Sequence, residues 1–171
     1  MRITGGQATG IRIETPPGVV RPAMDRMRES LFSILGDLED LSFLDLFSGS
    51  GVVALEAISR GARRATLVEK DRGKRGTIQG NLERVLGSLN FDPGISVVTA
   101  PVERYLLRVR ESFDIVYLDP PFDYRHKSDL LRRLARSGAL SEDSRVVLHY
   151  PGEETIDHGT LTVTDERRYG R

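Results

Sequence analysis

Asp119-Pro120-Pro121-Phe122 follows an apolar run at 113–118 and brings together groups suited to one reaction. The prolines fix two φ angles, so the Pro120 carbonyl points in a rigid direction beside the Asp119 carboxylate. A nucleobase amine donates two N–H groups, and these two oxygens can accept both. That would aim the nitrogen lone pair at an incoming methyl group, while Phe122 stacks on the base. We therefore interpret Asp119, Pro120 and Phe122 as catalytic residues that act on the exocyclic amine of a base, and we expect Asp119 to contact the cofactor as well.

A glycine-rich loop lies earlier in the chain. It connects an apolar run at 43–47 to a helical pattern at 51–60. Glycine allows the backbone to approach a ligand closely and to adopt positive φ, and the start of a helix presents free N–H groups. We expect this loop to bind a cofactor through Phe47, Ser48, Gly49, Ser50 and Gly51.

Acidic residues flank the loop on both sides. Glu69 and its neighbour Lys70 follow the next apolar run, where a carboxylate can accept hydrogen bonds from ribose hydroxyls. The loop also fits the dinucleotide pattern G-x-G-x-x-A, so an NAD-dependent oxidoreductase remains an alternative. Asp45 favours S-adenosylmethionine, because a carboxylate there suits a cationic ammonium and sulfonium and would repel a pyrophosphate.

The two motifs can form one site only if the strands that precede them end at the same edge of a sheet. Strands are expected near 43–47, 65–68, 95–98, 113–118 and 145–150, and a further one begins at Leu161–Val163. Helical patterns cover 51–60, the segment up to about 89, 102–110 and 127–136. Alternating βα units predict an α/β fold with a mostly parallel central sheet, helices on both faces, and a ligand beyond the carboxyl ends of the strands.

The N-terminal segment differs in composition from the rest. Residues 1–22 are rich in Gly, Thr and Pro and contain short alternating pieces, which predict a small β-hairpin or extended arm. A helix is expected to begin after Pro22. We divide the chain into this arm, 1–22, and a single compact methyltransferase domain, 23–171.

Composition excludes several classes of protein. The 171 residues carry no cysteine, which excludes disulfides and thiolate metal sites, and we expect no metal. No apolar run approaches the roughly 20 residues of a membrane helix, and the first residues lack the apolar region of a signal peptide. We expect a soluble, cytoplasmic protein without a membrane partner. Net charge is zero, but residues 1–28 hold five arginines against two acidic residues.

The chain resembles the bacterial 16S ribosomal RNA guanine-N2 methyltransferases of the RsmD type. The resemblance covers nearly the whole chain, and its most specific part is Arg21-Pro22 followed by Asp25-Arg26-Met27-Arg28-Glu29. The other matching segments are Met1-Arg2-Ile3 with Gly5-Gly6, Leu44-Asp45-Leu46-Phe47-Ser48-Gly49-Ser50-Gly51, Leu55-Glu56-Ala57, Ser59-Arg60-Gly61-Ala62, Val68-Glu69, Asn81-Leu82 and Leu118-Asp119-Pro120-Pro121-Phe122.

This resemblance implies a Rossmann-like class I S-adenosylmethionine-dependent methyltransferase fold. It also implies methyl transfer to N2 of a guanine in 16S ribosomal RNA, within an assembling 30S particle, by a protein that we expect to be monomeric. The arm is expected to contact RNA phosphates or to close over the cofactor. The expected RNA-binding residues are Arg2, Arg12, Arg21, Arg26, Arg28 and Phe122.

Three departures from the family pattern affect these expectations. An acid usually follows the third strand, whereas this chain has Pro101, so Glu103 or the Val102 backbone N–H is expected to contact the adenine. Phe122 stands where tyrosine is commoner, which keeps stacking but loses a hydroxyl. Relatives turn near a Tyr-Gly such as Tyr169-Gly170 and add a strand, which we expect to be missing here, leaving an open sheet edge.

Other functions also fit the motifs, since Asp-Pro-Pro-Phe does not choose among base amines. The main alternative is an N6-adenine methyltransferase that acts on DNA or RNA. A non-enzymatic module that retains a cofactor pocket is a further alternative.

Overall fold

A computed structural model describes residues 1–15, 24–152 and 154–168. Its centre is a five-stranded parallel sheet in the order β3-β2-β1-β4-β5. The strands are β1 (Ser42–Leu46), β2 (Arg64–Glu69), β3 (Gly94–Thr99), β4 (Ile115–Leu118) and β5 (Arg145–Leu148). The predicted α/β fold with a parallel sheet is therefore confirmed, because each βα unit returns the chain to the same edge of the sheet.

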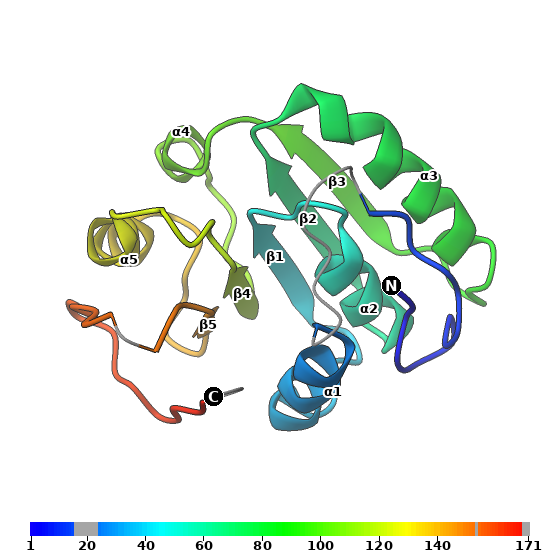
Figure 1. Ribbon diagram of the computed structural model, residues 1–171, viewed down its shortest axis with the longest axis horizontal. Helices are drawn as coiled ribbons and strands as arrows, with labels where there is room; N and C mark the ends of the chain where they lie inside the picture. The colour runs from blue at the N-terminus through cyan, green and yellow to red at the C-terminus, as the bar shows by residue number, and fades with distance from the viewer. Residues whose placement is uncertain (16–23, 153, 169–171) are drawn as a thin grey trace.

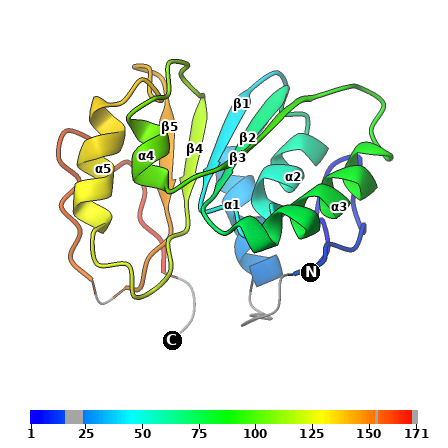
Figure 2. The ribbon, with the colours of Figure 1, turned by 90° about the horizontal axis from the view of Figure 1, so that it is seen from above.

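Helices cover both faces of the sheet (Figures 1 and 2). One layer contains α1 (Met24–Leu35), α2 (Val52–Ser59) and α3 (Arg75–Leu86), the last preceded by the 3₁₀ turn η1 (Arg72–Lys74). The other contains α4 (Val102–Leu106) and α5 (Lys127–Arg136). The buried apolar residues form two clusters, one for each layer. Alternation along β1 supplies both, since Phe43 packs with the first layer and Leu44 with the second.

The N-terminal segment is part of the first layer. Ile3, Ala8 and Ile13 are buried in the same cluster as residues of α1, α2 and α3. The predicted hairpin is not observed as regular strands. The described part of the segment has only an isolated antiparallel bridge between Arg2 and Arg12, beside which the Ile3 N–H donates to the Ile11 carbonyl at 3.0 Å. This segment is therefore held against the helical layer by the burial of its apolar residues and not by a ladder of strand hydrogen bonds.

The prediction of a strand that begins at Leu161–Val163 is wrong. Residues 160–168 adopt no regular secondary structure, and Val163 is 55% exposed. Three residues with alternating polarity do not make a strand unless they pair with an edge. In the described residues β5 therefore ends the sheet.

Candidate functional site

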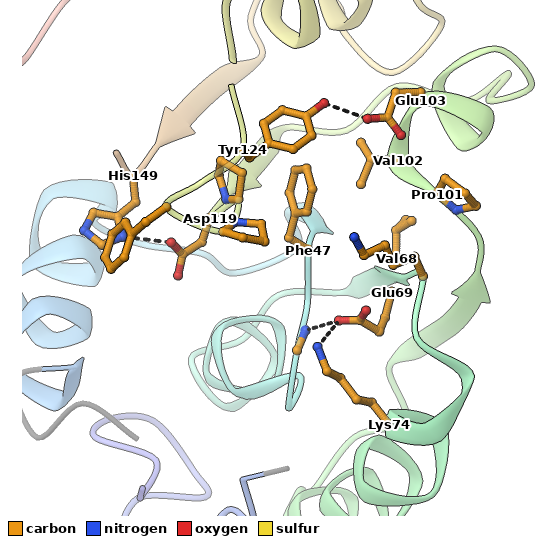
Figure 3. Close-up of a pocket in the computed structure, with 15 residues that line it drawn as sticks. Phe47, Val68, Glu69, Lys74, Pro101, Val102, Glu103, Asp119, Tyr124 and His149 are labelled. Atoms are coloured by element: carbon orange, nitrogen blue, oxygen red, sulfur yellow. Dashed lines mark hydrogen bonds and ion pairs between the residues drawn. The ribbon is translucent and has the colours of Figure 1, made fainter. Parts of the chain in front are cut away.

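Most of the residues predicted to be catalytic or to bind the cofactor lie at the carboxyl edge of the sheet. A cavity of about 320 Å³ opens there between the ends of β1, β2 and β4 (Figure 3). Its wall includes the glycine loop, the end of β2, the start of α4 and the segment after β4. The lining residues are Phe47, Gly49, Val68, Glu69, Lys70, Lys74, Pro101, Val102, Glu103, Asp119, Pro120, Pro121, Phe122, Tyr124 and His149.

Backbone hydrogen bonds shape the glycine loop. The N–H groups of Phe47 and Ser48 both donate to the Val68 carbonyl, at 3.1 and 3.0 Å, so the loop bends over the end of β2. Gly51 begins α2 with φ of 80°, and a Cβ there would lie 2.8 Å from a Leu67 methyl group. Both the conformation and the close approach require glycine. Phe47 also has φ of 80°, which the sequence does not signal.

Glu69 holds this loop through its carboxylate. Oε2 accepts from the Gly49 N–H at 3.0 Å and from Lys74 Nζ at 3.3 Å, while Oε1 accepts from the Asp71 N–H at 2.9 Å. The acid predicted to bind a ribose is thus fixed between the loop and η1, facing the cavity (Figure 3). The predicted Lys70 also lines the cavity, and Lys74, which was not predicted from the sequence, supplies a second cation.

Asp45 is buried beneath the loop, and neither carboxylate oxygen has a hydrogen-bond partner of ordinary geometry among the described residues. Burial raises its pKa to about 8 and the negative charge of Asp119 adds to the rise, although the Ala54 backbone lies close enough to lower the pKa slightly. The Ser48 hydroxyl is likewise buried and unpaired in the described part of the chain. Unsatisfied buried oxygens are costly, so their presence indicates a site that is completed by a ligand with donor groups or positive charge.

Not all predicted cofactor residues reach the cavity. Asp45, Ser48, Ser50 and Gly51 do not line it, and the Ser50 carbonyl accepts from Asn81 Nδ2 at 3.0 Å. Asn81 is fully buried in α3, and its side chain also pairs with the backbone N–H and C=O of Glu14, both at 2.9 Å. It therefore ties the N-terminal segment to the glycine loop.

The segment after β4 forms the opposite wall. Asp119 Oδ1 lies 2.9 Å from Nδ1 of His149, Pro120 is buried, and Phe122 is 44% exposed at the mouth. This segment therefore contributes a carboxylate and an aromatic side chain to the wall of the cavity.

Tyr124 and Glu103 close the α4 side of the cavity (Figure 3). The Tyr124 hydroxyl donates to Glu103 Oε1 at 2.6 Å, and the Tyr124 ring packs edge-on against Phe47. Burial, followed by the bond to Glu103, raises the pKa of the Tyr124 hydroxyl. Val102 and Glu103 line the cavity as predicted, beside the exposed Pro101. Tyr124 and His149 were not predicted from the sequence, although each is a polar ring close to a strand end.

The predicted RNA contact of Arg28 is wrong for this conformation. Arg28 is fully buried and donates to Glu56 Oε2 at 3.0 Å, to Asp25 Oδ1 at 2.8 Å and to the Arg2 carbonyl at 2.6 Å. Glu56 is also fully buried and pairs with Arg60 at 2.9 Å as well. The part of the sequence most specific to the family therefore contains an internal ion pair that joins α1 to α2.

The other predicted RNA-binding arginines are placed differently. Arg2, Arg12 and Arg26 are exposed, whereas Arg21 lies outside the described residues.

Within the described ranges, no group of three or more His, Asp or Glu side chains is arranged to hold a metal ion. No helix in the same ranges is long and apolar enough to cross a membrane.

Comparison with known proteins agrees with this geometry. A family model described as Conserved hypothetical protein 95 matches residues 1–171. Ribosomal RNA small subunit methyltransferase D of Escherichia coli (strain K12) is 34% identical over 166 residues, which cover 95% of this chain and 79% of that relative. The chain belongs to this methyltransferase family. The resemblance inferred from the motifs is thus confirmed.

Solved structures show the same fold. The Escherichia coli protein yhhF superimposes with a TM-score of 0.83 at 32% identity, over 99% of this chain and 92% of that one. A methyltransferase-like structure in complex with SAH has a TM-score of 0.61 at 21% identity, over 77% of this chain and 36% of the other, which supports the fold alone.

Proposed function

We propose that this protein transfers a methyl group from S-adenosylmethionine to the N2 amine of a guanine in 16S ribosomal RNA. One observation carries the proposal: the glycine loop with Glu69 and the Asp119–Phe122 segment line a single cavity from opposite sides. A cofactor on one wall and a base on the other would therefore meet within it. The choice of guanine rests on the family, whose Escherichia coli relative is a ribosomal RNA small subunit methyltransferase.

The glycine-loop wall suits S-adenosylmethionine, which supplies an electrophilic methyl group on a sulfonium centre. Glu69 is placed to accept hydrogen bonds from ribose hydroxyls, and the Gly49 backbone leaves room for close approach. Asp45 lies beneath the loop as a buried carboxyl group that a nearby positive charge would ionise. Phe47, Val102 and Glu103 offer an apolar surface and an acceptor for an adenine ring, which suggests how the Pro101 departure is compensated.

The opposite wall suits a base amine. Asp119 and the carbonyl of Pro120 would accept its two N–H groups, hold the nitrogen in line with the methyl group, and stabilise the positive charge that develops on nitrogen. Phe122 would stack on a base that has left its neighbours. Asp119 need not be a strong base, because a methylated amine cation loses its proton readily.

The RNA must be large enough to reach surfaces outside the cavity. We propose an assembling 30S particle in the cytoplasm as the substrate, with Arg2, Arg12, Arg21 and Arg26 near the phosphates. Local arginines can supply such contacts even though the net charge of the chain is zero.

Mass mapping of ribosomal RNA nucleosides tests the proposal. Cells that lack the protein should lose one N2-methylguanine from 16S RNA, and cells that regain it should recover that nucleoside. Restoration by the wild type but not by Asp119→Ala would link the product to this site. Recovery of N6-methyladenine without N2-methylguanine would instead support the adenine alternative.

A further inference from the structure

His149 sits at the end of β5, next to the catalytic wall. Strands β4 and β5 pair in parallel register up to Leu118 and Leu148. The backbone N–H of His149 continues the ladder by donating to the Leu118 carbonyl at 2.9 Å. Asp119 and His149 are therefore the first residues beyond the last paired positions of two neighbouring strands, and the sheet fixes where both side chains begin.

The two side chains meet at the cavity. Nδ1 of His149 lies 2.9 Å from Oδ1 of Asp119, and the two side chains are 32% and 26% exposed (Figure 3). Both residues line the cavity together with Pro120 and Phe122. In the described residues, His149 is the polar partner of the Asp119 side chain, and Oδ2 of Asp119 has none.

Two further acidic groups, Asp45 and the Tyr117 hydroxyl, lie near this pair, and burial keeps both protonated near neutral pH. The negative charge of Asp119 raises the pKa of Asp45, which is buried below, and the pKa of the Tyr117 hydroxyl on β4. Lys74 is paired with Glu69 across the cavity. Lys70 also lines the cavity, but in the described part of the chain no lysine or arginine forms an ion pair with Asp119, so the imidazole is the group that orients its carboxylate.

We propose that His149 is a positioning residue for methyl transfer. A carboxylate only accepts hydrogen bonds, so Nδ1 carries the hydrogen when Asp119 is ionised. This bond holds Oδ1 and leaves Oδ2, in a fixed orientation, for one N–H of the substrate amine. The inference rests on the proposed function, because it assigns to His149 the alignment of the acceptor that aims the nitrogen.

Methyl-transfer kinetics test the role. With small-subunit particles from cells that lack the enzyme, His149→Leu should lower kcat about tenfold to a hundredfold and leave KM for S-adenosylmethionine within about twofold. His149→Asn should keep kcat within about threefold of the wild type, because the asparagine amide can donate from near the Nδ1 position. His158→Leu, which changes a histidine in the segment after β5, is the matched control.

A purely structural role predicts a different pattern. It would lower the thermal midpoint of His149→Leu and affect the asparagine variant as strongly, with kcat and KM changing together. Unchanged kcat in His149→Leu, or equal losses in the leucine and asparagine variants, would overturn the proposal.

A second measurement does not depend on turnover. The chain has three histidines, so the ring nitrogens of His149 can be assigned in ¹⁵N spectra by their loss in His149→Asn. At about pH 8.5, above the ordinary titration range of imidazole, we expect the proton on Nδ1 in the wild type and a shift towards Nε2 in Asp119→Ala. Identical ring signals in both proteins would contradict the hydrogen bond. A wild type that shows this signature but methylates no ribosomal RNA would contradict only the proposed function.

Discussion

On the β1–β2 side of the cavity, backbone N–H groups of the loop donate the bonds that hold the wall, whereas on the β4–β5 side most of the bonds that hold the wall are donated by side chains. The glycine loop is held by N–H groups that donate to Val68 and to Glu69. The segment after β4 is held instead by Asp119 with His149, by Tyr124 with Glu103, and by Lys127 Nζ, which donates to the Tyr124 carbonyl at 2.6 Å.

The layers behind the two walls differ in how deeply their ion pairs are buried. The fully buried pair of Arg28 and Glu56 joins α1 to α2 behind the glycine loop. At the opposite wall Lys127 is buried, but its partner Glu154 is half-buried in the segment after β5, 2.9 Å away. In the proposed reaction a small cofactor would be enclosed by a rigid frame, while a base attached to a large RNA would need a wall that remains accessible. We therefore expect substitutions in the segment after β4 to lower activity without unfolding the protein. Substitutions of the Arg28–Glu56 pair should instead lower its stability.

The largest effect is expected from Asp119→Ala. Removal of the carboxylate should lower kcat for methyl transfer about 10²- to 10³-fold, because the amine loses an acceptor and its alignment. The thermal midpoint should stay within about 2 °C, since Asp119 is partly exposed and packs little. The exposed Asp143→Ala is the matched control, and undiminished activity in Asp119→Ala would refute the role of this wall.

Arg28→Met should act on stability instead. Glu56 would remain buried with one cation fewer, which lowers the free energy of unfolding by about 3 kcal/mol in urea denaturation. The double variant Arg28→Met with Glu56→Leu should recover part of that loss, because no buried charge is then left behind. Weaker RNA binding at unchanged stability would return Arg28 to the RNA interface.

Asp45→Asn should remove a pH dependence of stability. The pKa of Asp45 is about 8 in the folded protein, above its ordinary value of 3.8, so the folded state holds a proton that the unfolded chain releases. The wild type should therefore lose roughly 1 kcal/mol per pH unit relative to Asp45→Asn as pH rises towards 8, and no more beyond it. Unfolding curves between pH 5 and about 9 measure the difference. Parallel curves would show that Asp45 is ionised in the folded state.

The smallest effect concerns three exposed arginines of the N-terminal segment and α1, two elements that pack on the cofactor side although these side chains are proposed to bind RNA. Replacing Arg2, Arg12 and Arg26 together by alanine should weaken RNA binding about tenfold at low salt. The slope of log affinity against log salt should fall by about one for each phosphate that is no longer neutralised. Methyl-acceptor particles titrated at several salt concentrations provide the measurement.

A matched triple variant tests the location of this RNA-binding surface. The side chains of Arg104, Arg108 and Arg136 are exposed on the α4–α5 side and make no hydrogen bond or ion pair within the described part of the chain. Their replacement by alanine should leave the salt slope unchanged. If replacing these three arginines changes the salt slope and replacing Arg2, Arg12 and Arg26 does not, the RNA contacts the layer that contains α4 and α5.

The sequence predicted the cofactor side better than the base side. The glycine loop, Asp45 and Glu69 are close in sequence to strands with continuous apolar runs, so their positions follow from βα geometry. Residues 119–122 were also predicted, because prolines restrict the local backbone. His149 and Tyr124 were missed, since their roles depend on which strand lies beside β4 and on the path of a loop.

Charge was the least reliable guide. Arg26 and Arg28 are two residues apart in one helix, yet one is exposed and the other fully buried. Arg28 faces Glu56 and the Arg2 carbonyl, two groups that are distant in sequence, and local composition does not reveal them. The strand predicted at Leu161–Val163 failed for a similar reason, because local alternation does not specify a partner.

The buried proton of Asp45 has a consequence for calorimetry. A cation that binds above the glycine loop would stabilise the carboxylate and expel that proton into the solvent. The heat of binding near neutral pH would then contain the ionisation enthalpy of the buffer, so titrations in phosphate and in Tris would give different heats for the same affinity. Through one buried acid, cofactor binding becomes an exchange of a proton for a cation.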